Sequence, residues 1–288
     1  MDLCNIDQIK ALLAAHGFHF SKAKGQNFLT QAWVPQRIAE EAGLDADTGV
    51  LEVGPGIGCL TKELCLRAGK VCAVEVDTAL RPVLKITLGE FENLDIIFGD
   101  VLKLDLARLV QEQFPGKKPV ACANLPYYIT SPILTCLLET RLFSAVTVMV
   151  QKEVAQRICA KPGTADYSAF TVFCQYYGVP ELLFDVPPHC FIPQPKVVSS
   201  VIRLKLREEP PCTMLSEETF FRTVRAGFAM RRKTALNALA AGFPKLGKAG
   251  VAEALSECGL SPTARCETFS IPQFAALSDA LYRREHDV

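Results

Sequence analysis

Three polar motifs each follow an apolar segment in the first hundred residues, and together their side chains suit a nucleoside. Residues 52–61 contain a glycine turn, where Gly54 and Gly56 let backbone N–H groups approach a ligand near the start of a helix. Glu75 lies 21 residues after Gly54, and its carboxylate can accept two hydrogen bonds from ribose hydroxyls. Asp100 follows a third apolar segment and can accept a hydrogen bond from the exocyclic amine of an adenine. We therefore expect these motifs to meet in one nucleoside pocket.

A fourth motif, Asn124-Leu125-Pro126-Tyr127-Tyr128, combines an amide, a carbonyl fixed by a following proline and an aromatic ring. Such a set suits an exocyclic amine, whose nitrogen is a poor nucleophile because its lone pair is delocalised into the base. The Asn124 side-chain oxygen and the Leu125 carbonyl can hold its two N–H groups and favour a pyramidal nitrogen, while Tyr127 stacks on the base. Phe191, in a proline-framed segment, can supply a second ring. We predict that Asn124, Leu125, Tyr127 and Phe191 act on the reacting base.

Apolar segments alternate with helix-like segments for nearly two hundred residues, which predicts an α/β fold with a doubly wound, Rossmann-like parallel sheet. The expected strands are 49–53, 71–75, 95–99, 120–124 and 145–150, with 181–186 and 197–206 at one edge. The expected helices are 6–15, 60–68, 78–88, 107–113 and 132–140, the last with Ser131 as its cap and Pro132 in its first turn. After the proline-containing stretch 208–211 only helical periodicity remains. We therefore expect a sheet domain over 1–208 and a small all-helical domain over 209–288.

Composition excludes several classes of protein. With 49% hydrophobic and 22% charged residues the chain can bury a sizeable core, and no apolar run reaches the roughly 18 residues of a membrane span. The start lacks the long apolar segment of a signal peptide, so we expect a cytoplasmic protein without membrane contact. The 12 cysteines form no C-x-x-C pair, and the four histidines have no metal-ligand spacing. We expect reduced thiols and no metal site.

Charge is distributed unevenly along the chain. The formal net charge is zero, which argues against binding nucleic acid through bulk charge, but residues 203–248 hold ten basic and four acidic side chains. The pattern predicts one helix over 217–240, with Arg222, Arg225, Arg232 and Lys233 in an arc of about 100° beside its apolar side. Arg231 projects onto the apolar side and requires a partner or a helix break there. We expect the four arc residues to contact RNA phosphates, the alternative being a solvated face with intrahelical ion pairs.

The chain resembles the ribosomal RNA adenine N6-dimethyltransferases over essentially its whole length, and its bacterial small-subunit members most closely. Six motifs occur in the order found in that family. They are Gly25 to Leu29, residues 52–61, Val74 to Asp77, Gly99-Asp100, Asn124 to Tyr128 and Phe191 to Ser199.

The resemblance implies a class I methyltransferase domain that binds S-adenosylmethionine. The family binds it through residues matching Asn27, Leu29, Gly54, Glu75, Asp100 and Asn124, and we add Gly56 from the same glycine turn. The resemblance further implies dimethylation at N6 of two adjacent adenosines in a hairpin near the 3′ end of small-subunit ribosomal RNA. It also implies a role in small-subunit biogenesis, with a pre-ribosomal small subunit as partner, and we expect a monomer. Because the methylated amine is acidic and can lose its proton to water, we assign Asn124 to positioning and electrostatics.

Three alternatives remain at this point. The large-subunit enzymes of the same family commonly have phenylalanine where this chain has Tyr127, and the segment Phe191 to Ser199 also fits the small-subunit group better. An RNA-binding assembly or transcription factor can keep the fold without relying on catalysis, and the intact Gly54, Glu75, Asp100 and Asn124 argue against that. A nicotinamide-dependent oxidoreductase explains a glycine turn and Glu75, but the spacing is not G-x-G-x-x-G and the Asn124 motif has no role in it.

Overall fold

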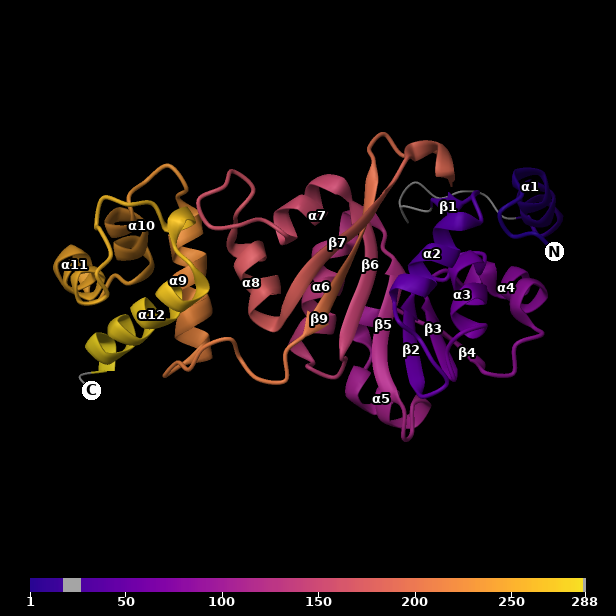
Figure 1. Ribbon diagram of the computed structural model, residues 1–288, viewed down its shortest axis with the longest axis horizontal. Coiled ribbons are helices and arrows are strands. Elements are labelled where there is room, and N and C mark those ends of the chain that lie inside the picture. Colours follow the sequence, from indigo (N-terminus) through magenta and orange to yellow (C-terminus); the bar gives the residue numbers. More distant parts are fainter. Residues whose placement is uncertain (18–26, 287–288) are drawn as a thin grey trace. The chain divides into compact units, whose positions relative to one another are not determined.

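A mixed sheet organises the N-terminal part of the computed structural model, which describes residues 1–17 and 27–286 (Figure 1). Its strands are β2 (Thr48–Val53), β3 (Lys70–Glu75), β4 (Leu94–Phe98), β5 (Lys118–Asn124), β6 (Ala145–Gln151), β7 (Gly178–Val186) and β9 (Ser199–Leu206). Their order across the sheet is β4-β3-β2-β5-β6-β9-β7. Neighbours from β4 to β6 pair in parallel, whereas β9 is antiparallel to β6. The predicted strands and the added edge are confirmed, and the sheet is mixed rather than wholly parallel.

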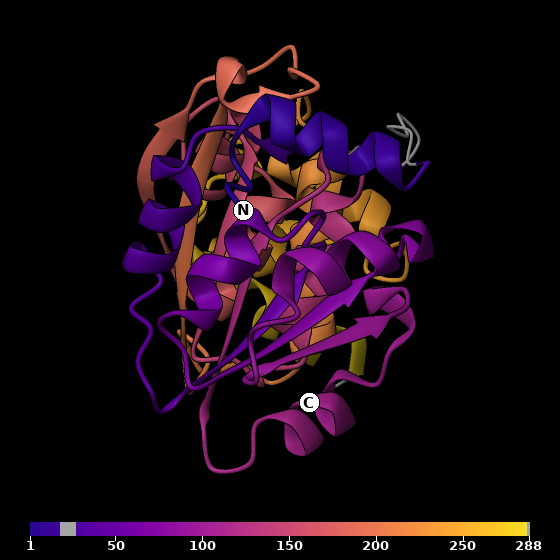
Figure 2. The same ribbon diagram turned by 90° about the vertical axis from the view of Figure 1, so that its right-hand side faces the viewer.

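Helices cover both sides of this sheet. On one side lie α1 (Ile6–Ala15), α2 (Trp33–Glu41), α3 (Cys59–Cys65) and α4 (Arg81–Leu88), and Figure 2 views the sheet from its β4 end, with indigo and purple helices above the front strands. Their apolar residues form one buried cluster with side chains of the strands, among them Ile9, Val34, Leu64, Leu84 and Val50. On the other side lie α5 (Leu106–Gln113) and α6 (Thr130–Glu139) (Figure 1). Buried strands with apolar side chains on both faces fit this arrangement.

The start of α6 differs from the prediction. The helix begins at Thr130, and its N-cap residue Ile129 makes no side-chain cap hydrogen bond. Ser131 therefore lies inside the first turn and is not the cap, because a 3₁₀ turn over Tyr127–Ile129 leads directly into the helix. Pro132 still lies in the first turn, where its missing N–H costs no intrahelical hydrogen bond.

A second, two-stranded sheet was not predicted from the sequence. It pairs β1 (Phe28–Leu29) with β8 (Phe191–Ile192) in antiparallel register, so that Leu29 lies opposite Phe191. Thr30 extends the connection, since its backbone N–H donates to the carbonyl of Cys190 at 2.8 Å. This pairing holds residues 28–30 against the segment that precedes β9.

The chain divides into two compact units, and the second is discontinuous in sequence. The first unit contains residues 1–155 and 179–206, and the second contains residues 156–178 and 207–288. The helix α7 (Lys152–Ile158) runs from one into the other. The predicted boundary at 208 is close to residue 207, where the chain enters the second unit for the second time. The prediction assigned residues 156–178 to the sheet domain, whereas they group with the second unit. That segment carries α8 (Ala169–Tyr177), whose Tyr176 and Tyr177 hydroxyls both donate to the Glu217 carboxylate, which explains why it groups with the later helices.

The second unit is helical, as predicted, but its first long helix is shorter than expected. Its elements are α8, α9 (Glu217–Ala229), α10 (Ala235–Gly242), α11 (Gly247–Glu257) and α12 (Ile271–His286). Ser216 caps α9, and Glu217 and Glu218 lie in its first turn, where negative charge is favoured. The single helix predicted over 217–240 is wrong, because the chain leaves helical geometry at Met230 and resumes it at Ala235.

Glycine at position 49 is required by packing in the centre of the sheet. A Cβ atom built on Gly49 would lie 2.5 Å from Cγ of Phe114, which follows α5. We expect Gly49→Ala to lower the free energy of unfolding of the first unit by about 1–3 kcal/mol, because the Phe114 ring has to shift. Fluorescence of Trp33, the one tryptophan of the chain, reports that unit during urea unfolding. Gly99→Ala is the matched control, since its Cβ would meet Leu104 only at 3.8 Å, and an equal loss in both variants would contradict the explanation.

Candidate active site

A cavity of about 190 Å³ opens at the carboxyl ends of β2, β3, β4 and β5, all within the first unit. This is the edge of an open α/β sheet where ligands bind. All four polar motifs of the sequence line it, as expected. The lining includes Asn27, Leu29, Glu52, Gly54, Gly56, Glu75, Asp100, Asn124, Leu125, Tyr127 and Tyr128.

The glycine turn after β2 depends on backbone conformations that other residues rarely adopt. Gly54 has φ of 73° and Gly56 has φ of 60°. At Gly56 a Cβ atom would also lie 3.1 Å from the Phe28 ring. The absent side chains let the turn lie close under the cavity, between β2 and α3.

Glu75 connects that turn to the end of β3. Its Oε2 accepts the Gly56 N–H at 3.2 Å, and its Oε1 accepts the Asp77 N–H at 2.8 Å. The side chain is buried, with 5% of its surface exposed. A carboxylate offers about four acceptor sites, so Glu75 can receive hydroxyl donors from a ligand.

Asp100 follows β4. The residue before it, Gly99, connects this strand end to β3, because the Gly99 N–H donates to the Glu75 carbonyl at 2.9 Å. Its Oδ1 accepts the Leu102 N–H at 3.1 Å, and its Oδ2 lies 3.9 Å from Nζ of Lys103. The carboxylate is thereby oriented at the cavity edge, where it can accept a hydrogen bond from an amine.

Asn124, at the end of β5, has an orientation set by the backbone just before β1. Its Nδ2 donates to the backbone carbonyl of Asn27 at 3.2 Å. The amide oxygen is therefore the atom available to accept a hydrogen bond from an incoming amine. The predicted motif around Asn27 and Leu29 begins at Gly25 and Gln26, which lie outside the described residues.

The Leu125 and Tyr127 positions are fixed by neighbouring strands. The Leu125 N–H donates to the Met149 carbonyl at 3.1 Å, and the Tyr127 hydroxyl hydrogen-bonds Oγ of Ser199 at 2.6 Å. Burial raises the pKa of Tyr127 above its usual value, and the hydrogen bond to Ser199 only partly opposes that rise. The phenol is therefore neutral at physiological pH and holds its ring in place. Tyr128 is 61% exposed and offers a second ring at the cavity mouth.

Phe191 does not lie where the sequence prediction placed it. Its side chain is only 2% exposed, and it is absent from the cavity lining. The reason is the pairing of β8 with β1, which packs Phe191 against Leu29 in the buried cluster. The ring thus offers no face for stacking on a base in this structure.

Sequence reasoning missed several residues that shape the cavity. Phe28 contacts the glycine turn, and Cys59 lines the cavity from the start of α3. Ser199 fixes Tyr127 from β9. Glu52 belonged to the glycine motif but received no role, although a carboxylate inside an apolar strand was a signal in itself.

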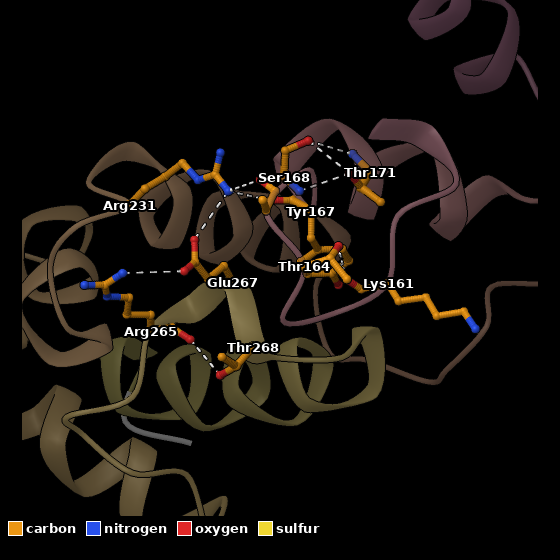
Figure 3. A network of polar contacts seen from close by, with 10 residues as sticks. Lys161, Thr164, Tyr167, Ser168, Thr171, Arg231, Arg265, Glu267 and Thr268 are labelled. Atoms are coloured by element: carbon orange, nitrogen blue, oxygen red, sulfur yellow. Dashed lines mark hydrogen bonds and ion pairs between the residues drawn. The ribbon is translucent and has the colours of Figure 1, made fainter. Parts of the chain in front are cut away.

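In the second unit, the break between α9 and α10 explains Arg231 and changes the predicted basic stripe. Arg231 donates to the carbonyls of Ala165 at 2.7 Å and Tyr167 at 3.3 Å, and it lies 3.4 Å from Glu267 (Figure 3). It therefore ties the loop before α8 to the turn after α9. Arg232 and Lys233 lie in that turn and are exposed. A single helical arc that joins them to Arg222 is wrong, because the helix ends before them.

Arg222 is engaged within the second unit. Its guanidinium makes two hydrogen bonds to the Glu285 carboxylate, at 2.8 and 3.0 Å, and donates to the Gly242 carbonyl at 2.9 Å. It also stacks over the Phe243 ring at 4.1 Å. By contrast, Arg225, Arg232 and Lys233 are exposed, and no described carboxylate lies within 4.0 Å of them.

Neither a metal centre nor a membrane span is found in the part of the chain that the structure describes. Residues 1–17 and 27–286 contain no group of three or more metal-ligating side chains. No helix within those residues has the length and apolar character needed to cross a membrane.

Class I methyltransferases bind S-adenosylmethionine at this edge of such a sheet, and the fold and the cavity place the chain in that class. A profile of the family described as ribosomal RNA adenine dimethylase matches residues 17–282. The chain belongs to that family. It is an S-adenosylmethionine-dependent enzyme that dimethylates adenine in ribosomal RNA.

Individual relatives cover nearly the whole chain. Ribosomal RNA small subunit methyltransferase A of Geobacillus thermodenitrificans is 46% identical, over 97% of each chain. The protein of the same name from Shouchella clausii is also 46% identical, over 98% of this chain and 96% of its own.

Solved structures agree with this fold. The 23S ribosomal RNA methyltransferase ErmE superposes with a TM-score of 0.67 at 29% identity, over 88% of this chain and 99% of its own. A dimethyladenosine transferase from Plasmodium falciparum superposes with a TM-score of 0.72 at 24% identity, over 90% of this chain and 98% of its own.

We expect Glu75→Ala to weaken the binding of S-adenosylmethionine at least about tenfold, because hydrogen bonds to a charged acceptor contribute about 1.5–3 kcal/mol each. Isothermal titration calorimetry measures the change, and thermal unfolding checks that the variant is folded. Glu90→Ala, at an exposed position after α4, is the matched control. A folded Glu75→Ala variant with unchanged affinity would remove Glu75 from the cofactor site.

Proposed function

We propose that this chain dimethylates N6 of two adjacent adenosines in a hairpin near the 3′ end of small-subunit ribosomal RNA. The names of the Geobacillus and Shouchella relatives support the choice of subunit. The observation that carries the chemistry is the hydrogen bond from Asn124 to the Asn27 carbonyl, because it turns the amide oxygen toward an incoming amine.

The cofactor is held, in this proposal, by residues from four strand ends. Glu75 accepts the ribose hydroxyls, Asp100 accepts a hydrogen bond from the adenine amine, and the remaining contacts come from the glycine turn, Asn124 and the segment that contains Asn27 and Leu29. The proposed set is Asn27, Leu29, Gly54, Gly56, Glu75, Asp100 and Asn124. S-adenosylmethionine supplies an electrophilic methyl group when it is bound.

The chain's own residues then prepare the substrate nitrogen. Asn124 Oδ1 and the Leu125 carbonyl accept hydrogen bonds from the N6 amine and favour a pyramidal nitrogen that can attack in line, while Tyr127 positions the base. After transfer the nitrogen carries a positive charge and releases its proton to water, so no side chain has to act as a base. In the second methyl transfer only one N–H remains, so one of these two acceptors holds it.

The cellular setting follows from the substrate. We propose a monomer that acts in the cytoplasm on a pre-ribosomal small subunit, with a role in small-subunit biogenesis. In this proposal the first unit holds the cofactor, and the second unit contacts RNA.

Mapping the modified nucleotides tests both the substrate and the role of Asn124. Incubation with labelled S-adenosylmethionine should modify two adjacent adenosines in unmethylated small subunits and leave large-subunit RNA unlabelled. We expect Asn124→Ala to reduce turnover far more than it reduces RNA affinity, because its contact to the amine strengthens in the transition state. Label in large-subunit RNA would favour the activity named for ErmE. Turnover within about twofold of the parent, together with lost RNA binding, would exclude the positioning role.

For RNA contact in the second unit we propose Arg225, Arg232 and Lys233. They are exposed cations, and Arg231 holds the turn that carries two of them (Figure 3). Arg222 belonged to the expected set, but the Glu285 carboxylate compensates its charge. We therefore expect Arg222 to contribute less to RNA affinity than the three exposed cations.

We expect Arg232→Gln to weaken subunit binding and to lower the slope of log affinity against log salt by about 1, because one phosphate contact is lost. Arg222→Gln is the matched comparison and should change the slope less while lowering thermal stability, since it leaves the Glu285 carboxylate without its partner. Filter binding across a salt series measures both. A parental slope in Arg232→Gln would mean that RNA is held elsewhere.

A further inference from the structure

Two cysteine thiols meet beside the cavity, and the proposed function gives neither of them a role. Cys59 lines the cavity and is 7% exposed, whereas Cys4 precedes α1 and is half-buried. The Cys59 sulfur lies 2.9 Å from the Leu3 carbonyl. That carbonyl belongs to the peptide bond that leads into Cys4, so the Cα atom of Cys4 is within about 6 Å of the Cys59 sulfur. The two thiols are hydrogen-bonded to each other, and a disulfide can bridge such a pair.

The contact between the two thiols makes Cys4 the more reactive one. The hydrogen bond with Cys59 lowers the pKa of Cys4, although burial opposes that change. Among the nearby charges, Lys62 lowers the pKa further, and Asp2 and Glu63 raise it. Every other cysteine of the chain has a raised pKa, for which burial is the main cause except at Cys59. Because peroxides react with thiolates that solvent can reach, Cys4 is the thiol that a peroxide oxidises first.

Cys59 is placed to react with the oxidised form of Cys4. The pKa of Cys59 is raised by the hydrogen bond with Cys4 and by burial, and the charges of Cys4 and Glu52 add to the rise. Two of these causes come from the Cys4 thiolate, and both weaken when Cys4 becomes a neutral sulfenic acid. The Cys59 thiol then loses its proton more readily, at the moment when its neighbour becomes an electrophile.

We propose that Cys4 and Cys59 form a site of oxidative modification, whose oxidant is a hydroperoxide and whose product is a disulfide that weakens cofactor binding. The Cys4 sulfur attacks a peroxide oxygen, so that the O–O bond breaks, an S–O bond forms, and the leaving oxygen takes a proton and departs as water or an alcohol. The Cys59 sulfur then attacks the Cys4 sulfur. An S–S bond forms, the S–O bond breaks, and the released hydroxide takes the Cys59 proton to give water. Overall, the two sulfurs lose two electrons, which the peroxide gains.

The disulfide changes the cavity through Cys59. In the reduced protein its sulfur lies 3.7 Å from the carbonyl of Leu29, which also lines the cavity. The S–S bond, at about 2.05 Å, is far shorter than the contact of two non-bonded sulfur atoms, so the two sulfurs have to approach each other. Cys59 directly follows Gly58, which has φ of 97° and donates its N–H to the Pro55 carbonyl at 2.9 Å. The glycine turn therefore shifts with Cys59, and this effect on the cofactor rests on the proposed cofactor site.

Peptide mapping of the full chain tests the oxidation. The protein is reduced, freed of reductant and treated with hydrogen peroxide, and the remaining thiols are blocked with N-ethylmaleimide before digestion with trypsin. Residues 1–10 and 38–62 are then separate peptides, each of which contains one cysteine. We expect a cross-link between these two peptides as the main product, and its disappearance on treatment with dithiothreitol.

Three variants separate the roles of the two thiols. In Cys59→Ser we expect Cys4 to stop at the sulfenic acid, which dimedone labels. In Cys4→Ser we expect neither a cross-link nor a label at Cys59. Cys136→Ser is the matched control, because Cys136 is half-buried like Cys4 but has a pKa that burial raises, and it should behave as the parent does. Thermal unfolding shows whether each variant is folded, and if Cys59→Ser does not fold, the cross-link in the parent protein still decides.

Calorimetry with S-adenosylmethionine before and after oxidation tests the effect on the cavity. We expect the oxidised parent to bind at least about fivefold more weakly, dithiothreitol to restore its affinity, and Cys4→Ser to be unaffected by the same peroxide treatment. Coupling between two sites is reciprocal. Saturating S-adenosylmethionine should therefore lower the fraction of disulfide at a fixed ratio of reduced to oxidised dithiothreitol.

Each other result overturns the inference. If Cys4 stays reduced at a peroxide concentration that oxidises Cys136, Cys4 is not the reactive thiol. A main cross-link to a third cysteine would assign another pair. A disulfide between Cys4 and Cys59 with unchanged affinity for S-adenosylmethionine would remove the effect on the cavity. If S-adenosylmethionine does not bind to the reduced parent protein, the proposed cofactor site fails, whereas the peptide map still decides about the thiols, so the two failures are distinguishable.

Discussion

The cavity depends on one carboxylate that holds two strand ends together. Glu75 accepts one backbone N–H from the glycine turn after β2 and one from the turn after β3. Without that acceptor, the two N–H groups would face a buried region unpaired, and the turn would lose the restraint that keeps it under the cavity. The same side chain is therefore both part of the scaffold and a polar group presented to a ligand. Because one side chain has both roles, the site is compact although its residues come from the ends of four strands.

The sheet and most of the polar groups could be predicted because both are encoded locally. Short apolar runs indicate buried strands, and the residue that follows each run is at the carboxyl edge of a parallel sheet. That reasoning placed Gly54, Glu75, Asp100 and Asn124 in one cavity, and the structure confirms it. Contacts between distant segments were not predictable in this way. The pairing of Leu29 with Phe191 has no local signal, and it is the reason that Phe191 is buried.

The helical unit illustrates the same limit. Periodicity extended one helix from 217 to 240, since Ala235 and Leu239 continue the apolar side. Tertiary contacts override that pattern, because Arg231 leaves the helix to bind carbonyls of the loop before α8. The sequence did indicate the conflict, as an arginine fell on the apolar side, but only the structure identifies the partners. Segment 156–178 was assigned to the sheet domain for a related reason, because its helix packs with elements that follow forty residues later.

The long-range contacts of Asn27 and Leu29 determine when, during synthesis, the chain can bind its cofactor. Asn27 meets Asn124 across 97 residues of sequence, and Leu29 is held by a strand that begins only at Phe191. During synthesis, the ends of β2, β3 and β4 can form as soon as the first hundred residues have emerged, and they already carry Glu75 and Asp100. The segment with Asn27 and Leu29 obtains its strand partner only when β8 has been made, because contacts over long sequence separations form late. A partly synthesised chain therefore exposes these polar groups at the edge of the sheet before the cavity is enclosed.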